Sequence, residues 1–190
     1  MTMKKLLCAA AVCSMMVAAP AAFAQAGSKA DYDAAVKTAD ANYKAANTKC
    51  DGLKDNAKDV CKAEAKRDRD VAKANAEASR DGTDKAHAKA MKTKADRDYD
   101  VSKEMCDDKS GNAKDVCVKE AKATHERNLA PAKTEKAAAT GTSTDVAEAR
   151  ADAKKDTVDA AYKADKEKCD AMSGDAKDKC QANVKAKYAR

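Results

Sequence analysis

The chain has 190 residues, and its 38 Lys and Arg outnumber its 32 Asp and Glu to give a net charge of +6. Beyond residue 24 its only Leu, Ile, Val or Phe residues are two Leu and nine Val, about 7% of that stretch and far below the ~20% that marks a chain able to fold around a core. This composition excludes a conventional hydrophobic core and leaves either solvated helices in close, Ala-lined contact or intrinsic disorder.

The first 24 residues have the pattern of a secretory signal peptide. A short basic start precedes an apolar run that ends in small residues at A-F-A, the last being Ala24. The pattern predicts export and cleavage after Ala24. Cys8 and Cys13 lack the small preceding residue of a lipoprotein signal, so no lipid anchor is expected. No later stretch is apolar enough to be expected to span a bilayer.

Three segments of the remaining chain, each bounded by two cysteines with ten residues between them, are close relatives. They are CDGLKDNAKDVC (Cys50–Cys61), CDDKSGNAKDVC (Cys106–Cys117) and CDAMSGDAKDKC (Cys169–Cys180). Six residues after the first Cys stands a residue type that caps helix N-termini: Asn56, Asn112 or Asp175. An acid three residues later fits a capping box: Asp59, Asp115 or Asp178. The second half of each segment is therefore predicted to begin a helix.

The first half of each segment is predicted to end a helix. A tyrosine precedes the first Cys by seven residues in every repeat: Tyr43, Tyr99 and Tyr162. Two helical turns place Tyr and Cys on one face. Each repeat is thus predicted to be an αα-hairpin, with Gly52, Gly111 and Gly174 loosening the turns. The repetition weighs against disorder.

The expected fold is all-α, with three disulfide-stapled αα-hairpin repeats. The hairpins are expected at residues 25–81, 82–130 and 145–190, with a linker at 131–144 that contains Pro and Gly. Gly82 is predicted to stop one helix and Thr83 to cap the next. The pattern leaves open whether the hairpins stack or remain strung out in an elongated or coiled-coil-like form.

Six cysteines beyond the signal segment allow fifteen pairings. The repeat favours Cys50–Cys61, Cys106–Cys117 and Cys169–Cys180, because each pair is then contained in one unit. Such a bond contributes about 3 kcal/mol in the chain-entropy model, and an oxidising compartment preserves it. For hairpins with so little to bury, the disulfide is the expected staple.

The pattern C-D-x-x-x-G-x-A-K-D-x-C, followed in the middle unit by KEAKA (Lys119–Ala123), resembles a group of small Ala/Lys-rich exported proteins of Gram-negative bacteria, sometimes labelled TolA-like. The resemblance covers the three motif regions, and the cysteine spacing is its specific part. It implies a periplasmic location and no mechanism. The uncleaved membrane helix and terminal folded domain of TolA proteins are not apparent in this sequence.

The sequence contains few residues that could support catalysis. His87 and His125 are expected on exposed helix surfaces, and HERNL has Leu129 where a zinc-protease signature needs its second His. Asp96, Asp98 and Asp100 are spaced like the start of an EF-hand, but Val101 replaces the required Gly. No catalytic residue, metal ligand or cofactor is therefore assigned, and no enzymatic activity is expected.

Two kinds of binding have to be weighed, metal or thiol chemistry at the cysteines and binding of nucleic acid. Reduced cysteines next to acids, such as Cys106 with Asp107 and Asp108, could hold a metal ion or serve thiol redox chemistry. Nucleic-acid binding is not expected, because acids are interspersed among the lysines and aromatic platforms are missing. The favoured prediction is a periplasmic, non-enzymatic structural or interaction protein of the cell envelope, possessing helical surfaces that could meet other envelope proteins.

Overall fold

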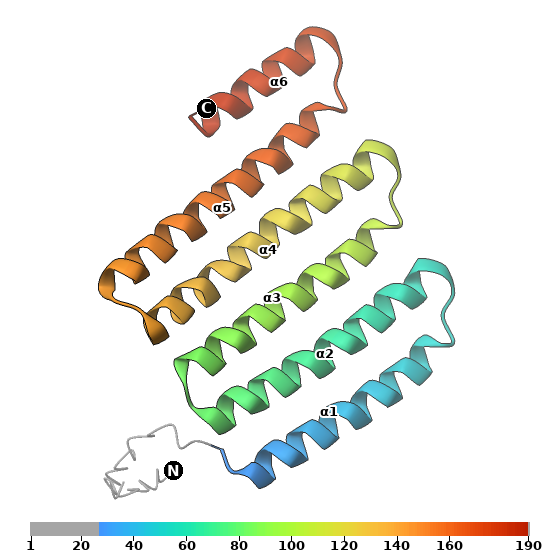
Figure 1. Ribbon diagram of the computed structural model, residues 1–190. Coiled ribbons are helices and arrows are strands. Elements are labelled where there is room, and N and C mark those ends of the chain that lie inside the picture. The colour runs from blue at the N-terminus through green and yellow to red at the C-terminus, as the bar shows by residue number, and fades with distance from the viewer. Residues whose placement is uncertain (1–26, 190) are drawn as a thin grey trace, which may run out of the picture.

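The computed structural model describes residues 27–189, so the predicted signal peptide at 1–24 lies outside the described residues. This part of the chain is all-α, as predicted, and holds six helices and no strand (Figure 1). The helices are α1 (Lys29–Cys50), α2 (Asp55–Asp81), α3 (Asp84–Cys106), α4 (Gly111–Thr140), α5 (Ser143–Cys169) and α6 (Gly174–Lys187).

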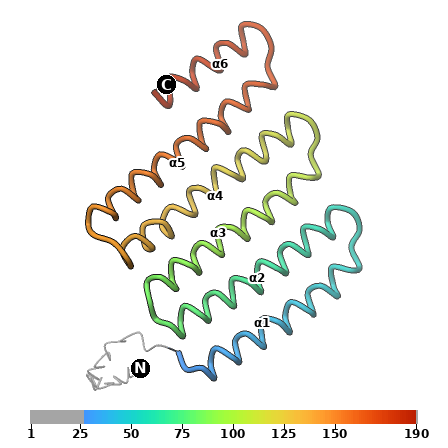
Figure 2. The backbone as a smooth tube through the Cα atoms, in the orientation of Figure 1, coloured from blue at the N-terminus to red at the C-terminus, as the bar shows by residue number. Residues whose placement is uncertain are grey.

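The helices form a single antiparallel layer in chain order. Each described helix contacts only the helices next to it in the sequence, and the backbone runs back and forth across the layer (Figures 1 and 2). The three hairpin turns lie along one edge of the layer, and the α2–α3 and α4–α5 connections lie along the other. The hairpins therefore stack side by side, which the sequence had left open.

The predicted break between the first two hairpins is confirmed. Gly82 ends α2 in the left-handed conformation, with φ of 59°, and the Thr83 side chain accepts a hydrogen bond from the Ala86 amide. Two other helices begin with capping boxes, Ser28 with Asp31 in α1 and Thr142 with Asp145 in α5. Reciprocal hydrogen bonds in these boxes satisfy amides that a helix start leaves open.

The predicted linker at 131–144 is wrong over most of its length. Helix α4 continues through Pro131 to Thr140, so only two residues, 141–142, separate it from α5. A proline inside a helix removes one hydrogen bond and costs about 3 kcal/mol. Contacts with neighbouring helices help to offset this cost: Ala132 is buried, and Lys133 pairs with Asp156 of α5 at 2.6 Å. The third hairpin is consequently stacked on the second rather than set apart.

The buried side chains are almost all small. Alanines make up most of them, together with the first cysteine of each pair and two valines, Val101 and Val184. Two clusters of buried alanines lie between hairpins: Ala74, Ala78, Ala86 and Ala90 at α2–α3, and Ala123, Ala160 and Ala164 at α4–α5. Because Ala lets helix backbones approach closely, a layer can form without large aliphatic residues.

Candidate functional site

Each hairpin is closed by one disulfide near its turn. The structure pairs the cysteines as predicted, Cys50–Cys61, Cys106–Cys117 and Cys169–Cys180, with a Cα–Cα distance of 5.6 Å in every pair. The first cysteine is the last residue of its helix and is at most 1% exposed. The second lies in the second turn of the following helix. The bond thus fixes the two helix ends where they leave the turn.

An ion pair spans each turn beside the disulfide. The Asp after the first Cys meets the Lys of the A-K-D sequence in all three units: Asp51–Lys58 at 3.3 Å, Asp107–Lys114 at 2.8 Å and Asp170–Lys177 at 2.8 Å. Hydrogen bonding to Lys58 lowers the pKa of Asp51, and hydrogen bonding to Asp107 raises the pKa of Lys114. These exposed pairs stabilise little individually. They do explain why the two residue types recur together.

The residue that opens the second helix of each hairpin has a positive φ. These are Asp55 at 50°, Gly111 at 53° and Gly174 at 54°, all five positions after the first Cys. Glycine suits this conformation because it lacks a Cβ. In the first unit Asp55 takes the position, and Gly52 stands at an ordinary φ three residues earlier. The glycines predicted only to loosen the turns therefore have a specific role in two of the three units.

Each recurrent tyrosine meets a partner eight residues after the second cysteine of its hairpin. The Arg69 guanidinium lies 4.2 Å from the Tyr43 ring centre, His125 stacks on Tyr99 at 4.7 Å, and Tyr188 meets Tyr162 edge-on at 5.6 Å. The partners differ chemically, but all give favourable contacts with an aromatic ring. Aligning the repeats beyond the second cysteine would have found this position.

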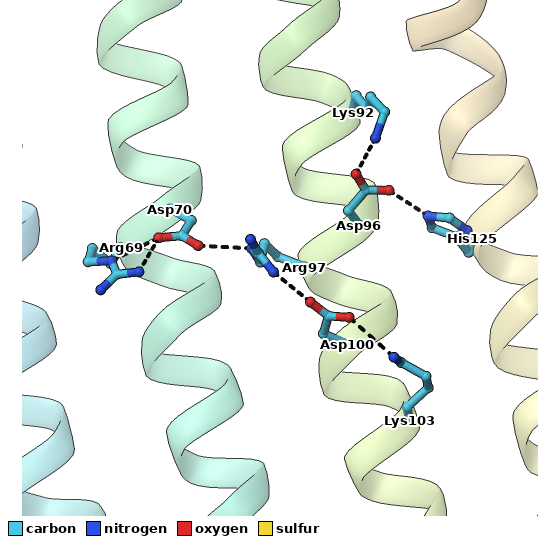
Figure 3. A network of polar contacts seen from close by, with 8 residues as sticks. All are labelled: Arg69, Asp70, Lys92, Asp96, Arg97, Asp100, Lys103 and His125. Carbon is cyan, nitrogen blue, oxygen red and sulfur yellow. Dashed lines mark hydrogen bonds and ion pairs between the residues drawn. The ribbon is translucent and has the colours of Figure 1, made fainter.

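The expectation that both histidines are exposed is wrong for His125 and confirmed for His87. His125 is 9% exposed, and its Nε2 donates a hydrogen bond to Asp96 at 2.8 Å (Figure 3). Asp96 also pairs with Lys92 at 2.5 Å, one turn earlier on α3. The imidazole is buried because it occupies the tyrosine-partner position, where the sequence context of charged neighbours gave no indication of burial.

A second set of charges joins the first two hairpins. Asp70 of α2 pairs with Arg69 beside it at 2.6 Å and with Arg97 of α3 at 2.9 Å, and Arg97 continues to Asp100 at 2.7 Å (Figure 3). The Asp70 side chain is only 17% exposed, so this bridge is less screened than the pairs at the turns.

The predicted N-cap role of Asn56, Asn112 and Asp175 is wrong, since Lys54, Ser110 and Ser173 precede the helices and none makes a side-chain cap bond. Two of the three predicted caps instead bind the next hairpin. Asn56 donates to the carbonyl of Glu104 at 2.9 Å, and Asn112 donates to the carbonyl of Glu167 at 3.4 Å. No described hairpin follows the third unit, which has Asp175 in this place.

Within residues 27–189, no group of three or more His, Cys, Asp or Glu side chains is placed to hold a metal ion. The acids of the EF-hand-like segment lie within α3, where Asp96 and Asp98 pair with lysines one turn earlier. Cys106 is in a disulfide, and Asp107 is paired with a lysine. In this oxidised state the cysteine sulfurs cannot act as thiolate ligands.

No protein-family model, curated protein or solved structure matches the chain. None of the described helices combines the length and apolar character needed to cross a membrane. The repeated hairpin, with its disulfide, turn ion pair and tyrosine contact, is therefore the feature from which a function has to be inferred.

Proposed function

We propose that the protein is exported to the periplasm and acts there as a non-enzymatic structural or interaction protein of the cell envelope. Three disulfides fit an exported protein, because such bonds persist in oxidising compartments. The resemblance of the cysteine repeats to Ala/Lys-rich periplasmic proteins supports the same location.

The single-layer arrangement carries the interaction part of the proposal. Because each described helix contacts only its sequence neighbours, no described element covers either broad face of the layer. The tyrosines that could have met a partner helix are used within their own hairpins. A partner would therefore meet the charged, Ala-containing broad faces, and extended repeat surfaces of this kind serve as binding surfaces in other arrays.

The test combines location, thiol state and contact. The full chain is expressed in a Gram-negative bacterium, fractionated, and alkylated without reductant before intact-mass measurement. A photo-crosslinking amino acid is placed at exposed positions Lys66 and Lys119, with position 43 inside the first hairpin as the control. We expect a periplasmic chain with three internal bridges and a discrete envelope adduct from an exposed position only.

Two results would refute this function. A cytoplasmic chain, or free thiols in the native protein, would favour the alternative of a metal-binding or thiol redox protein that uses the cysteine pairs. If the chain is periplasmic and oxidised but gives no position-specific adduct, the proposed location stands and the proposed interaction role is refuted.

A further inference from the structure

A groove lies beside the second hairpin, near the edge of the layer that carries the α2–α3 connection. It has a volume of about 610 Å³ and is formed by the end of α2, the first half of α3 and the second half of α4. Its apolar lining includes Ala88, Leu129 and Ala132. Cavities of about 300–1,000 Å³ with a mainly apolar lining and a few polar groups are the usual form of small-molecule sites. We call this feature the hairpin 2 groove.

In the first hairpin a tyrosine occupies the corresponding position and leaves a smaller hollow, of about 160 Å³. Tyr32 lies beneath Arg80, whose guanidinium is 4.3 Å from the ring centre. The same repeat positions, 56 residues later, hold Ala88 and Lys136, and both line the hairpin 2 groove. The hairpin 2 groove is thus larger than the hollow beside Tyr32, and the smaller volume of an alanine methyl group compared with a phenol contributes to this difference.

The same comparison shows a change of charge. Asp33 and Glu77 of the first hairpin correspond to Lys89 and Lys133 of the second, and Lys73 corresponds to Leu129. The groove consequently combines an added large apolar side chain with added cations. Its lining holds five lysines against two carboxylates.

Two of the five lysines are available to a ligand. Lys89 pairs with Glu77 at 2.7 Å, and Lys133 pairs with Asp156 at 2.6 Å. Lys92 pairs with Asp96. Lys85 and Lys136 are exposed and have no ion-pair partner among the described residues. The groove therefore presents unpaired ammonium groups beside an apolar lining.

We propose that the hairpin 2 groove binds a single-chain amphiphile with an anionic headgroup, of the fatty-acid class. The alkyl chain would lie against Leu129, which is half-buried, over the buried Ala88 and Ala132, and the carboxylate would meet Lys85 and Lys136. Charge-assisted contacts orient the headgroup, and burial of the chain supplies most of the affinity. The inference goes beyond the proposed function and does not depend on where the protein is located.

The test uses the purified, oxidised full chain and the fluorescent fatty acid cis-parinaric acid, kept below its micellar concentration. We expect saturable binding of one molecule per chain. Dodecanoate should displace the probe, dodecan-1-ol should compete at least about fivefold more weakly, and acetate should not compete, because the site needs both the chain and the charge. Added salt should weaken the binding of dodecanoate more than the binding of dodecan-1-ol.

Two variants and a matched control locate the site. Ala88→Tyr places the tyrosine of the first hairpin in the groove and should weaken probe binding at least about tenfold. The double variant Lys85→Gln/Lys136→Gln should weaken the binding of dodecanoate about fivefold and leave the affinity for dodecan-1-ol unchanged. The control Lys109→Gln/Lys119→Gln makes the same charge change on exposed positions of this hairpin outside the groove, and should bind as the unmodified chain does.

Three outcomes would overturn the proposal. The first is an absence of saturable probe binding. The second is an unchanged affinity for dodecanoate in the variant Lys85→Gln/Lys136→Gln, which would place the ligand elsewhere. This outcome can be measured even if the variant Ala88→Tyr does not fold. The third is a dimer in size-exclusion chromatography that Ala88→Tyr converts to a monomer, because a second copy of the chain would then be the occupant.

Discussion

The interfaces within hairpins and between hairpins are built differently, although both join antiparallel helices of similar composition. Within hairpins, a disulfide and a tyrosine contact recur in each unit. Between hairpins, the helices meet through clusters of buried alanine, one Asn-to-carbonyl hydrogen bond at each junction, and ion pairs such as Arg97–Asp70 and Lys133–Asp156. A chain poor in large aliphatic residues thus combines covalent closure at the turns with close small-residue packing between units.

The largest effect is expected from removal of a staple within a hairpin. Replacing the middle pair in the variant Cys106→Ala/Cys117→Ala should lower the free energy of unfolding by about 3 kcal/mol, because the unfolded chain regains the entropy of an open loop. Urea unfolding followed by circular dichroism measures the change. Reductant should lower the stability of the unmodified chain as well, and equal stability with and without reductant would contradict the staple role.

A smaller loss is expected from overfilling an interface between hairpins. Ala78 is 2% exposed in the α2–α3 cluster, so Ala78→Leu should cost about 2 kcal/mol by forcing the two helices apart. Ala72→Leu is the matched control, because Ala72 is exposed on the same helix. Urea unfolding of both variants gives the comparison, and an equal effect of the two substitutions would show that the interface is not closely packed.

The asparagine contact between hairpins should contribute less. Asn56→Asp removes the donor to the Glu104 carbonyl and should lower the free energy of unfolding by about 1 kcal/mol. Asp175→Asn makes the reverse change in the third unit, where no described helix follows, and should have almost no effect. Thermal unfolding of the two variants would settle the point, and a similar loss in both would argue for a role within the hairpin.

An effect of similar size concerns the loss of stability of the third hairpin in acid. Hydrogen bonds from Lys187, at 2.7 Å, and from Tyr188, at 2.9 Å, help to lower the pKa of Asp165 to about 2. Because the folded pKa lies below the unfolded value, the stabilisation is complete above about pH 4 and is lost as the pH falls through 2. Solvent screening limits it to about 1 kcal/mol.

The variant Asp165→Asn isolates this contribution. In urea unfolding, the difference between the unmodified chain and the variant should be about 1 kcal/mol at pH 5 and close to zero at pH 2. A difference that stays constant between these pH values would show that the carboxylate charge is not the cause.

The features set by local sequence could be predicted. Cysteine spacing and residue repetition predicted the hairpins, the disulfides and the break at Gly82, because each depends on residues close together in the chain. The features set by packing could not. Pro131 indicated a linker, yet contacts with α5 keep α4 helical; Asn56 indicated a cap, yet its amide reaches a carbonyl 48 residues away. His125 is buried by a tyrosine from another helix.

The hairpin 2 groove could not be predicted for a related reason. Ala88 and Leu129 are separated by 41 residues, and neither is unusual in its own helix. Only their approach across the interface between α3 and α4, with a lysine-rich margin, creates a concave surface. Comparing the repeats position by position would have shown that a tyrosine is replaced by alanine there, but not that a cavity results.

Each described helix contacts only the helices next to it in the sequence, and this has a consequence for how the chain folds. Low contact order makes folding fast, because little loop entropy is lost before contacts form. Cysteines that become partners are separated by eleven positions, so a chain delivered from its N-terminus can finish one hairpin before the next pair emerges. The hairpins can then fold one after another, and the next helix can pack against a hairpin that is already oxidised and folded.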